Sequence, residues 1–266
     1  MTTSVNFDSA AATYESTRGF PPGIGQPVGQ GLAEWIGPLT SEARILEVGV
    51  GTGRIARPLS AAGLPMIGVD LSVNMLNELR RLQPDETSYP RILRADATRL
   101  PFGSARFTAA VGVHIFHLIP EWKQALAEIE RVVAPGGALF IGYDHRSDDA
   151  PSARLMRAWR GLLSARGISK NHPGAAEFER VDDEMAARGV VATERVVASW
   201  ATRRTVGDLL VGFQQRTWSS TWNMPAEVFA STLDELRDWA HNELGDEQTI
   251  VETAVEFRWK RFDLHR

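Results

Sequence analysis

Three glycines that alternate with other residues constrain this chain more than any other feature. Gly49, Gly51 and Gly53 directly follow an apolar run over 45–48, and apolar residues return at helical spacing from Ile55. This order predicts a short buried strand, a glycine turn and a helix. Glycine permits positive φ and lets a bound molecule approach the backbone without a Cβ in the way. In open α/β sheets, ligands bind at such turns, at the carboxyl ends of the strands.

Strands and helices alternate on both sides of this turn. Helices are predicted over 7–16, 24–36, 73–82 and 121–133, and strands over 65–70, 91–95, 107–113 and 138–143. The helix over 73–82 has an apolar stripe of Val73, Leu76, Leu79 and Leu82. This alternation predicts an α/β fold with a doubly wound, mostly parallel sheet.

The pattern changes after residue 145. Helices are predicted over 151–166, 175–188, 205–216 and 225–244, and two further strands over 190–202 and 249–263. Thr205 and Asp208 have the spacing of a capping box, with Asp in the place of the usual glutamate. The loop after the third of these helices carries Trp218 and Trp222.

Acidic residues close three successive predicted strands, namely Glu47, Asp70 and Asp96. A carboxylate such as that of Asp70 can accept hydrogen bonds from both hydroxyls of a ribose. The alternative is that Asp70 only caps the following helix, but Ser72 is better placed to do so. A loop aspartate such as Asp96 is also a common turn former. Three acids at three successive strand ends are nevertheless harder to explain by local structure alone.

Composition excludes several classes of function. The chain has no cysteine, which removes disulfides, thiolate metal sites and cysteine nucleophiles. Its net charge of −4 offers no basic field for nucleic acid or an anionic membrane. No apolar run approaches the roughly 18 residues of a membrane helix, and the first residues lack the pattern of a signal peptide. We therefore expect a cytoplasmic protein with no nucleic acid or membrane partner.

Two other nucleotide-binding motifs are absent from this sequence. The dinucleotide fingerprint requires glycine at the first, third and sixth places, and Arg54 stands at the sixth place counted from Gly49. The P-loop pattern fails as well, because no Gly-Lys-Ser/Thr follows the turn. A nicotinamide-dependent enzyme is therefore a weaker alternative.

The stretch over 44–57, RILEVGVGTGRIAR, resembles the first motif of the class I S-adenosylmethionine-dependent methyltransferases, with Glu47 in the acidic place. Further motifs are similar to those of this family and of its ubiquinone/menaquinone-type group. They are Phe7, Asp8, Ala11 and Tyr14 near the start, the Leu-Pro-Phe turn over 100–102, and Pro-Gly-Gly over 135–137. The resemblance covers 44–143 well and the ends loosely.

The resemblance implies S-adenosyl-L-methionine as the cofactor and a set of residues that bind it. These are Tyr14, Arg18, Glu47, Gly49, Gly51, Gly53, Asp70, Leu71, Asp96, Ala97 and His114. Within the set, Arg18 would pair with the carboxylate of the methionine end, or would be an ordinary solvated arginine. Asp96 and the Ala97 amide would contact adenine, with Leu100 or Phe102 packed nearby.

The same resemblance implies one methyltransferase domain over 1–266 with seven strands, the last antiparallel between strands five and six. Its parts would be a helical cap (1–40), a cofactor-binding core (41–145), closing strands (190–202 and 249–263) and a lid (146–174 and 203–246). Arg216, Trp218 and Trp222 would belong to the lid and close the acceptor pocket. Equally, the tryptophans would be core aromatics.

A small-molecule acceptor is the remaining substrate class. The tetrapeptide typical of base-amine methylation is absent after 107–113, and the missing cysteine excludes carbon-5 pyrimidine methylation. Only Asp144 could serve a catechol-type metal site, so we expect no metal. His117 is the first candidate for a general base and His145 the second, since imidazole titrates near neutral pH. Structural packing of His117 and a non-catalytic cofactor-binding protein of the same fold stay open.

Overall fold

The structure is a computed structural model that describes residues 4, 7–8, 11–37, 44–83, 90–168, 174–175, 178–216, 221 and 224–264. The chain divides into two compact units. The first unit comprises Met1–Tyr143, Pro173–Ala198 and Phe257–Arg266, and the second comprises Asp144–His172 and Ser199–Glu256. The long strands that end the sheet pass from one unit into the other.

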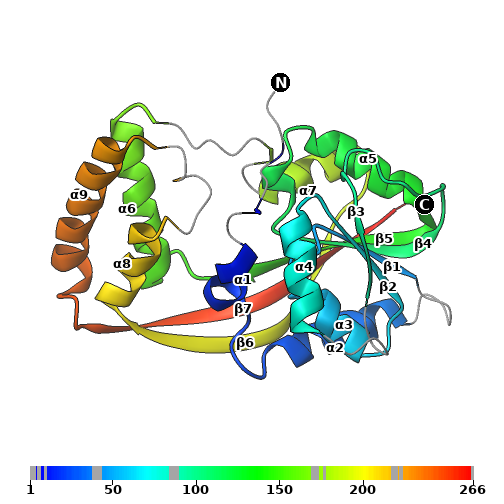
Figure 1. The fold of residues 1–266 in the computed structure, drawn as a ribbon, viewed down its shortest axis with the longest axis horizontal. Helices are drawn as coiled ribbons and strands as arrows, with labels where there is room; N and C mark the ends of the chain where they lie inside the picture. The colour runs from blue at the N-terminus through cyan, green and yellow to red at the C-terminus, as the bar shows by residue number, and fades with distance from the viewer. Residues whose placement is uncertain are drawn as a thin grey trace. The chain divides into compact units, whose positions relative to one another are not determined.

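The sheet has seven strands in the order β3-β2-β1-β4-β5-β7-β6 (Figure 1). Their bounds are β1 Ile45–Val48, β2 Met66–Asp70, β3 Arg91–Arg94, β4 Phe107–Val113, β5 Val133–His145, β6 Thr193–Thr205 and β7 Ile250–Asp263. β1 to β5 pair in parallel, and Leu46 of β1 lies between Ile67 and Ala110. All four residues of β1 are buried, as expected for a central strand covered on both faces.

β7 runs antiparallel between β5 and β6. The Leu264 amide donates to the Gly137 carbonyl (2.9 Å), and Tyr143 lies against Arg258. The two strands are antiparallel because residue numbers rise along β5 while those of the contacting residues fall along β7. This arrangement confirms the predicted position of the last strand and the doubly wound, mostly parallel sheet.

In the first unit, helices cover both faces of the sheet (Figure 1). The helices of the chain are α1 Ala11–Arg18, α2 Gly25–Ile36, α3 Ala56–Ala61, α4 Val73–Leu82, the 3-10 turn η3 Phe116–Leu118, α5 Trp122–Val132, α6 Pro151–Ala165, α7 Phe178–Ala187, α8 Val206–Gln214 and α9 Ala226–Leu244. Thirteen of the predicted elements are recovered to within three residues at each end, which is the usual uncertainty of boundaries predicted from sequence.

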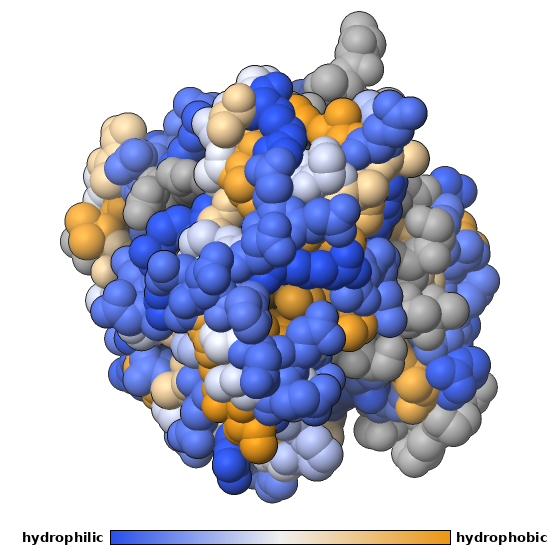
Figure 2. All heavy atoms as spheres, turned by 90° about the vertical axis from the view of Figure 1, so that its left-hand side faces the viewer, coloured by the Kyte–Doolittle hydropathy of each residue, from blue (hydrophilic) through white to orange (hydrophobic). Residues whose placement is uncertain are grey.

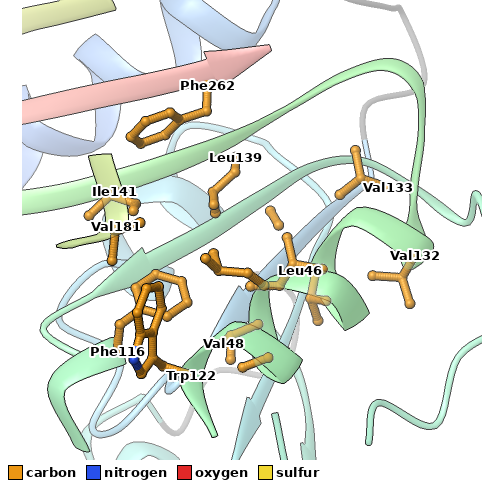
Figure 3. Close-up of a cluster of buried hydrophobic side chains, with 14 of the residues drawn as sticks. Leu46, Val48, Phe116, Trp122, Val132, Val133, Leu139, Ile141, Val181 and Phe262 are labelled. Atoms are coloured by element: carbon orange, nitrogen blue, oxygen red, sulfur yellow. The ribbon is translucent and has the colours of Figure 1, made fainter. Parts of the chain in front are cut away.

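The larger core of the first unit lies between the central strands and the helical layer formed by η3, α5 and α7 (Figure 3). Its buried side chains include Leu46, Val48, Leu139 and Ile141 from the strands and Phe116, Trp122, Ile129, Val132 and Val181 from the helical side. α5 contributes because its apolar residues recur every three or four positions, which places them on one face.

Successive side chains of a strand point to opposite faces of the sheet, so the remaining residues of these strands face the helical layer that contains α2. Phe140 packs edge-on against Trp35 of α2, with ring centroids 5.6 Å apart. From β7, the Trp259 indole donates to the Val28 carbonyl (3.3 Å). Aromatic side chains therefore attach α2 to the sheet on this face.

The second unit has its own core, built by α6, α8 and α9. Trp159 lies at its centre, 5.3 Å from Phe213 and 5.9 Å from Phe229 between ring centroids. Outside this core, Arg154 of α6 pairs with Glu243 of α9 (2.7 Å). On the face drawn in Figure 2, hydrophilic residues predominate and hydrophobic ones form separate patches.

Three local predictions are wrong in detail. The first helix begins at Ala11 rather than at residue 7, because the Asp8 carboxylate caps α4 instead of its own helix. Val73 is 39% exposed and Met75 takes its place in the buried stripe of α4. β5 begins at Val133 and not at residue 138, because Val133 already pairs with Phe107 of β4. The regular pairing is interrupted after Val133, where Gly136 has φ at 80°, and it continues from Ala138. The polar turn there is a bulge within the strand.

Candidate cofactor site

All three glycines of the turn after β1 have positive φ, namely 75° at Gly49, 53° at Gly51 and 82° at Gly53. A Cβ at Gly49 would lie 2.6 Å from Ile115 Cδ1, so close packing also requires glycine there. At Gly51 a Cβ would meet no atom within 4 Å. The middle of the turn therefore borders open space, where a ligand can approach the main chain.

Asp70 ends β2 and holds the glycine turn in place. Its Oδ2 accepts from the Gly51 amide (2.9 Å) and its Oδ1 from the Ser72 amide (2.8 Å). Burial raises the pKa of the Asp70 carboxyl, and these backbone hydrogen bonds oppose the rise. Each carboxylate oxygen can accept more than one hydrogen bond, so Asp70 keeps capacity for a ligand hydroxyl.

Glu47 is buried beneath the turn, with 2% of the residue exposed. Burial, and next the charge of Asp70, hold its pKa well above the ordinary range, although a hydrogen bond from the Ala56 backbone opposes this. Its Oε2 has no hydrogen-bond partner among the residues that the structure describes. A buried carboxyl oxygen without a partner is costly, and such an atom calls for an explanation.

The N-terminal segment is fixed on both sides of the glycine turn. Glu15 of α1 accepts a hydrogen bond from the hydroxyl of Thr52 within the turn (2.9 Å) and pairs with Arg57 beyond it. On the α4 side, Asp8 accepts from the Ser72 hydroxyl and from the Asn74 amide (3.2 Å). The sequence indicated Asp8 only as part of the N-terminal motif and did not indicate Glu15 or Thr52 at all.

Tyr14 and Arg18 lie together on this segment. The Arg18 guanidinium carbon is 5.0 Å from the centroid of the Tyr14 ring, and the two side chains are hydrogen bonded. Burial raises the pKa of Tyr14, the charges of Arg18 and Arg54 oppose that rise, and the charge of Asp70 adds to it. Tyr14 and Arg18 are thus in the same neighbourhood as Asp70 and the turn, and their contact with the methionine end of the cofactor stays a prediction.

The third acid, Asp96, is exposed after β3. Its Oδ1 accepts from both the amide (2.9 Å) and the hydroxyl (2.8 Å) of Thr98, so it does form a turn. Ala97 is half-buried, and the Leu71 carbonyl accepts from the Arg94 side chain (3.2 Å). The Ala95 amide donates to the Asp70 carbonyl (3.1 Å), which brings this loop next to the end of β2.

The Leu-Pro-Phe turn faces the core. Leu100 is buried, and the Phe102 ring packs edge-on against Phe107 with centroids 5.0 Å apart. Arg131 of α5 donates to the Leu100 and Phe102 carbonyls (3.1 and 2.7 Å). Anchoring by α5 therefore explains this turn without contact to a ligand.

His114 directly follows β4 with φ at 52°, a left-handed conformation that is uncommon outside glycine. Such backbone strain is concentrated at functional sites. His117 lies in η3, and both histidines are half-buried. The His117 carbonyl accepts from the Gly174 amide (3.1 Å), and a Cβ at Gly174 would lie 2.1 Å from the Phe116 carbonyl oxygen. Residues 174–175 therefore fix η3 from a distant part of the chain.

The remaining candidates belong to the second unit. His145 is the last residue of β5. Arg216 has φ at 49°, lies 4.1 Å over the Phe229 ring and donates to the Met224 carbonyl (3.3 Å), so it anchors the loop before α9. Trp218 and Trp222 lie outside the described residues. Lid membership and the role of His145 stay predictions.

The described ranges contain no group of three or more His, Cys, Asp or Glu side chains arranged to hold a metal ion. They also contain no helix long and apolar enough to cross a membrane.

Comparison with known proteins identifies the core of this chain. Residues 46–141, which carry the glycine turn and the strand-end acids, match the methyltransferase domain family. These residues are a methyltransferase domain, and the cofactor of this domain is S-adenosylmethionine. The family predicted from the glycine turn and its neighbouring motifs is therefore confirmed.

A demethylmenaquinone methyltransferase of Renibacterium salmoninarum is 38% identical over 134 residues, which are 50% of this chain and 55% of that protein. An uncharacterized methyltransferase of Mycobacterium bovis is 28% identical over 88% of this chain and 85% of that protein. The chain thus spans about half the length of the first of these relatives. A putative methyltransferase structure from Bacillus halodurans shares the fold, with a TM-score of 0.59 at 16% identity over 89% of this chain and 98% of its own.

Proposed function

We propose that this protein transfers the methyl group of S-adenosylmethionine to a small-molecule acceptor. The observation that carries the proposal is the conjunction of an open glycine, Gly51, with a buried and unpartnered carboxyl oxygen on Glu47. An ammonium group is the donor that such an oxygen requires. The amino-acid end of S-adenosylmethionine supplies one.

The residues around the turn fit the rest of the cofactor. In this proposal Asp70 would accept hydrogen bonds from the ribose hydroxyls, Asp96 and the Ala97 amide would contact adenine, and Leu71 would belong to the same site. Arg18 would pair with the carboxylate, and the main chain at His114, with its φ of 52°, would line the methionine end. When bound, the cofactor supplies a methyl group on a sulfonium, which is already a good leaving group.

The protein's own contribution to the reaction is mostly alignment, which can supply roughly 7–11 kcal/mol of the barrier. His117 takes a proton from a phenol or ammonium acceptor, with His145 as the second candidate. Predicted lid segments over 146–174 and 203–246 determine which acceptor binds. A demethylmenaquinone methyltransferase among the relatives supports a small-molecule acceptor. The net charge of −4 supports an enzyme without nucleic acid partners, and the location that we propose is the cytoplasm.

Calorimetry with S-adenosylhomocysteine and with NADH tests the cofactor. We expect S-adenosylhomocysteine to bind and Asp70→Ala to lose about 1–3 kcal/mol of its binding free energy, because the ribose hydroxyls then face an unfilled site. Binding of NADH without S-adenosylhomocysteine would contradict the proposal and favour the nicotinamide alternative.

A methyl-transfer screen over small phenols, amines, acids and a demethylated quinone tests turnover. A methylated product formed only with S-adenosylmethionine supports the enzyme. Tight S-adenosylhomocysteine binding without product from any acceptor class would favour the second candidate, a non-catalytic cofactor-binding protein with the same site.

A further inference from the structure

Two carboxylates meet on a single residue, Ser72, at the start of α4. The Ser72 amide donates to Asp70 Oδ1 (2.8 Å), and the Ser72 hydroxyl donates to Asp8 Oδ1. Asp8 comes from the N-terminal segment, 64 residues away from Ser72 in the sequence. The two acids therefore lie close together at the end of β2, one on the main-chain donor of Ser72 and the other on its side-chain donor.

Further hydrogen bonds fix Asp8 at this place. Its carboxylate also accepts from the Asn74 amide (3.2 Å), and its carbonyl accepts from the Asn74 side chain (3.2 Å). The Met75 amide donates to the Ser72 hydroxyl (3.1 Å). Amides at the start of a helix can hold a phosphate group. Here the amides of Ser72, Asn74 and Met75 are bound by groups of the protein itself.

One cation stands beside the two acids. Arg94 is in register with Asp70 on the neighbouring strand β3, and its Nε donates to the Leu71 carbonyl (3.2 Å). In nucleotide sites of other proteins, an arginine near the ribose accommodates a phosphate on a ribose hydroxyl. The charge of Arg94 would offset that of a single carboxylate. With both acids ionised, Asp8 makes the sum of the three charges negative.

From this geometry we infer that Asp8 determines the specificity of the ribose site, because together with Asp70 it admits free ribose hydroxyls and rejects a phosphate on them. The inference deepens the proposed function and rests on it. A ribose hydroxyl can donate to a carboxylate, whereas a phosphate ester has no such proton and carries about 1.5 to 2 negative charges at pH 7. Nucleotides with this phosphate share the nucleoside of S-adenosylmethionine, so rejecting them requires a repulsive group.

Competition calorimetry tests the inference, with adenosine and its 2′, 3′ and 5′ monophosphates each displacing S-adenosylhomocysteine. The 5′ monophosphate carries the same charge as the other two, but away from the ribose hydroxyls. Wild type should bind the 2′ and 3′ monophosphates at least about tenfold more weakly than adenosine, since like charges meet. Asp8→Asn keeps the size of the side chain and removes its charge. It should strengthen at least one of these two nucleotides about fivefold or more relative to adenosine, and leave the 5′ monophosphate within about twofold.

Three further variants separate the charge of Asp8 from the structure of the segment. Glu15→Gln weakens the other attachment of this segment, at Thr52 and Arg57, and should leave the preference among the nucleotides unchanged. Asp8→Asn combined with Arg94→Gln removes the cation as well, so the gain for the phosphorylated nucleotides should disappear. Asp8→Ser should shift the preference in the same direction as Asp8→Asn, and it replaces that variant if Asp8→Asn does not fold.

Three results would overturn the inference. The first is a wild type that binds the 2′ and 3′ monophosphates as tightly as adenosine, or that adenosine does not displace from S-adenosylhomocysteine. The second is an unchanged preference in the Asp8 variants, and the third is an equal change in Glu15→Gln. Each would leave the proposed function standing, since S-adenosylhomocysteine would still bind. A wild type that binds no S-adenosylhomocysteine would contradict the proposed function itself.

Discussion

Glu47 and Asp70 differ in how their carboxyl groups are satisfied, although both are acids at the ends of neighbouring strands. Asp70 accepts two backbone amides that fix the turn and the start of α4. Glu47 keeps one buried oxygen without a partner among the described residues. Burial of an incompletely paired acid lowers stability in the free protein. We interpret Glu47 as a residue retained for its ligand rather than for folding.

The raised pKa of Glu47 predicts a pH-dependent stability difference. An unfolded glutamate loses its proton near about pH 4.3, whereas the buried Glu47 keeps its proton to higher pH. Its stabilising contribution is therefore complete below that value and is lost as the pH rises toward the folded pKa, at about 1.4 kcal/mol per pH unit. Glu47→Gln stays neutral and escapes this loss.

Thermal unfolding of wild type and Glu47→Gln from pH 5 to pH 8 measures the effect. The variant should gain in melting temperature over wild type as the pH rises. Its affinity for S-adenosylhomocysteine should fall, because Glu47 can give up its proton when the ammonium binds, whereas an amide cannot become charged. A difference in melting temperature that stays constant with pH would argue against a buried, protonated Glu47.

His117 can be tested as a base by kinetics. At saturating cofactor, His117→Gln should lower kcat by roughly 10²–10⁴ and remove the acidic limb of the pH profile. His145→Gln is the matched variant for the second candidate. A loss below about tenfold with an intact profile would show that His117 serves only to pack η3.

At the scale of elements, the start of α4 joins three parts of the chain. The Ser72 hydroxyl accepts from the Met75 amide (3.1 Å), which is an N-cap, and it also donates to Asp8. The Ser72 amide binds Asp70 (2.8 Å). The cap therefore ties the helix, the N-terminal segment and the second strand to one another beside the proposed ribose site.

Ser72→Ala should destabilise the protein by about 0.5–2 kcal/mol, the usual effect of losing an N-cap. It should also weaken S-adenosylhomocysteine, because Asp8 loses a partner next to the site. Thr205→Ala is the matched control, since Thr205 caps α8 in the predicted capping box with Asp208 (3.0 Å). It should cost similar stability and leave the affinity unchanged. Equal affinities for both variants would mean that this junction is structural only.

At the scale of the molecule, the chain builds two separate cores. The residues proposed to bind the cofactor all lie in the first unit. The second unit has a helical core of its own around Trp159. Such a division predicts that damage to the second core affects acceptor chemistry and spares the cofactor.

Trp159→Ala tests this separation. Removing a buried tryptophan should destabilise the second unit by about 3–5 kcal/mol. Methyl transfer should fall, while the calorimetric dissociation constant for S-adenosylhomocysteine should stay within about threefold of wild type. A large loss of cofactor affinity would show that the second core supports the first, contrary to the expectation.

The sequence by itself determined the glycine turn, the order of the strands and helices, and the family. These features are local, because positive φ at Gly51 and the apolar periodicity of α5 depend on near neighbours. The spacing of motif residues within one strand-turn-helix unit is likewise a local property of the sequence. For that reason the capping box of α8 and the candidate acid Asp70 could be named in advance.

Only the tertiary structure decided which groups meet. Asp8 bonds Ser72 across 64 residues and Glu15 bonds Thr52 across 37, and no local pattern marks such pairs. The burial of Glu47 likewise depends on both neighbouring strands and on the helix after the turn. Residue type and spacing specify backbone conformation, whereas hydrogen-bond partners and pKa values depend on what packing brings near. The same holds for Arg54, whose guanidinium carbon lies 5.8 Å from the ring centroid of Phe257 on the last strand. Only the tertiary structure could reveal this contact.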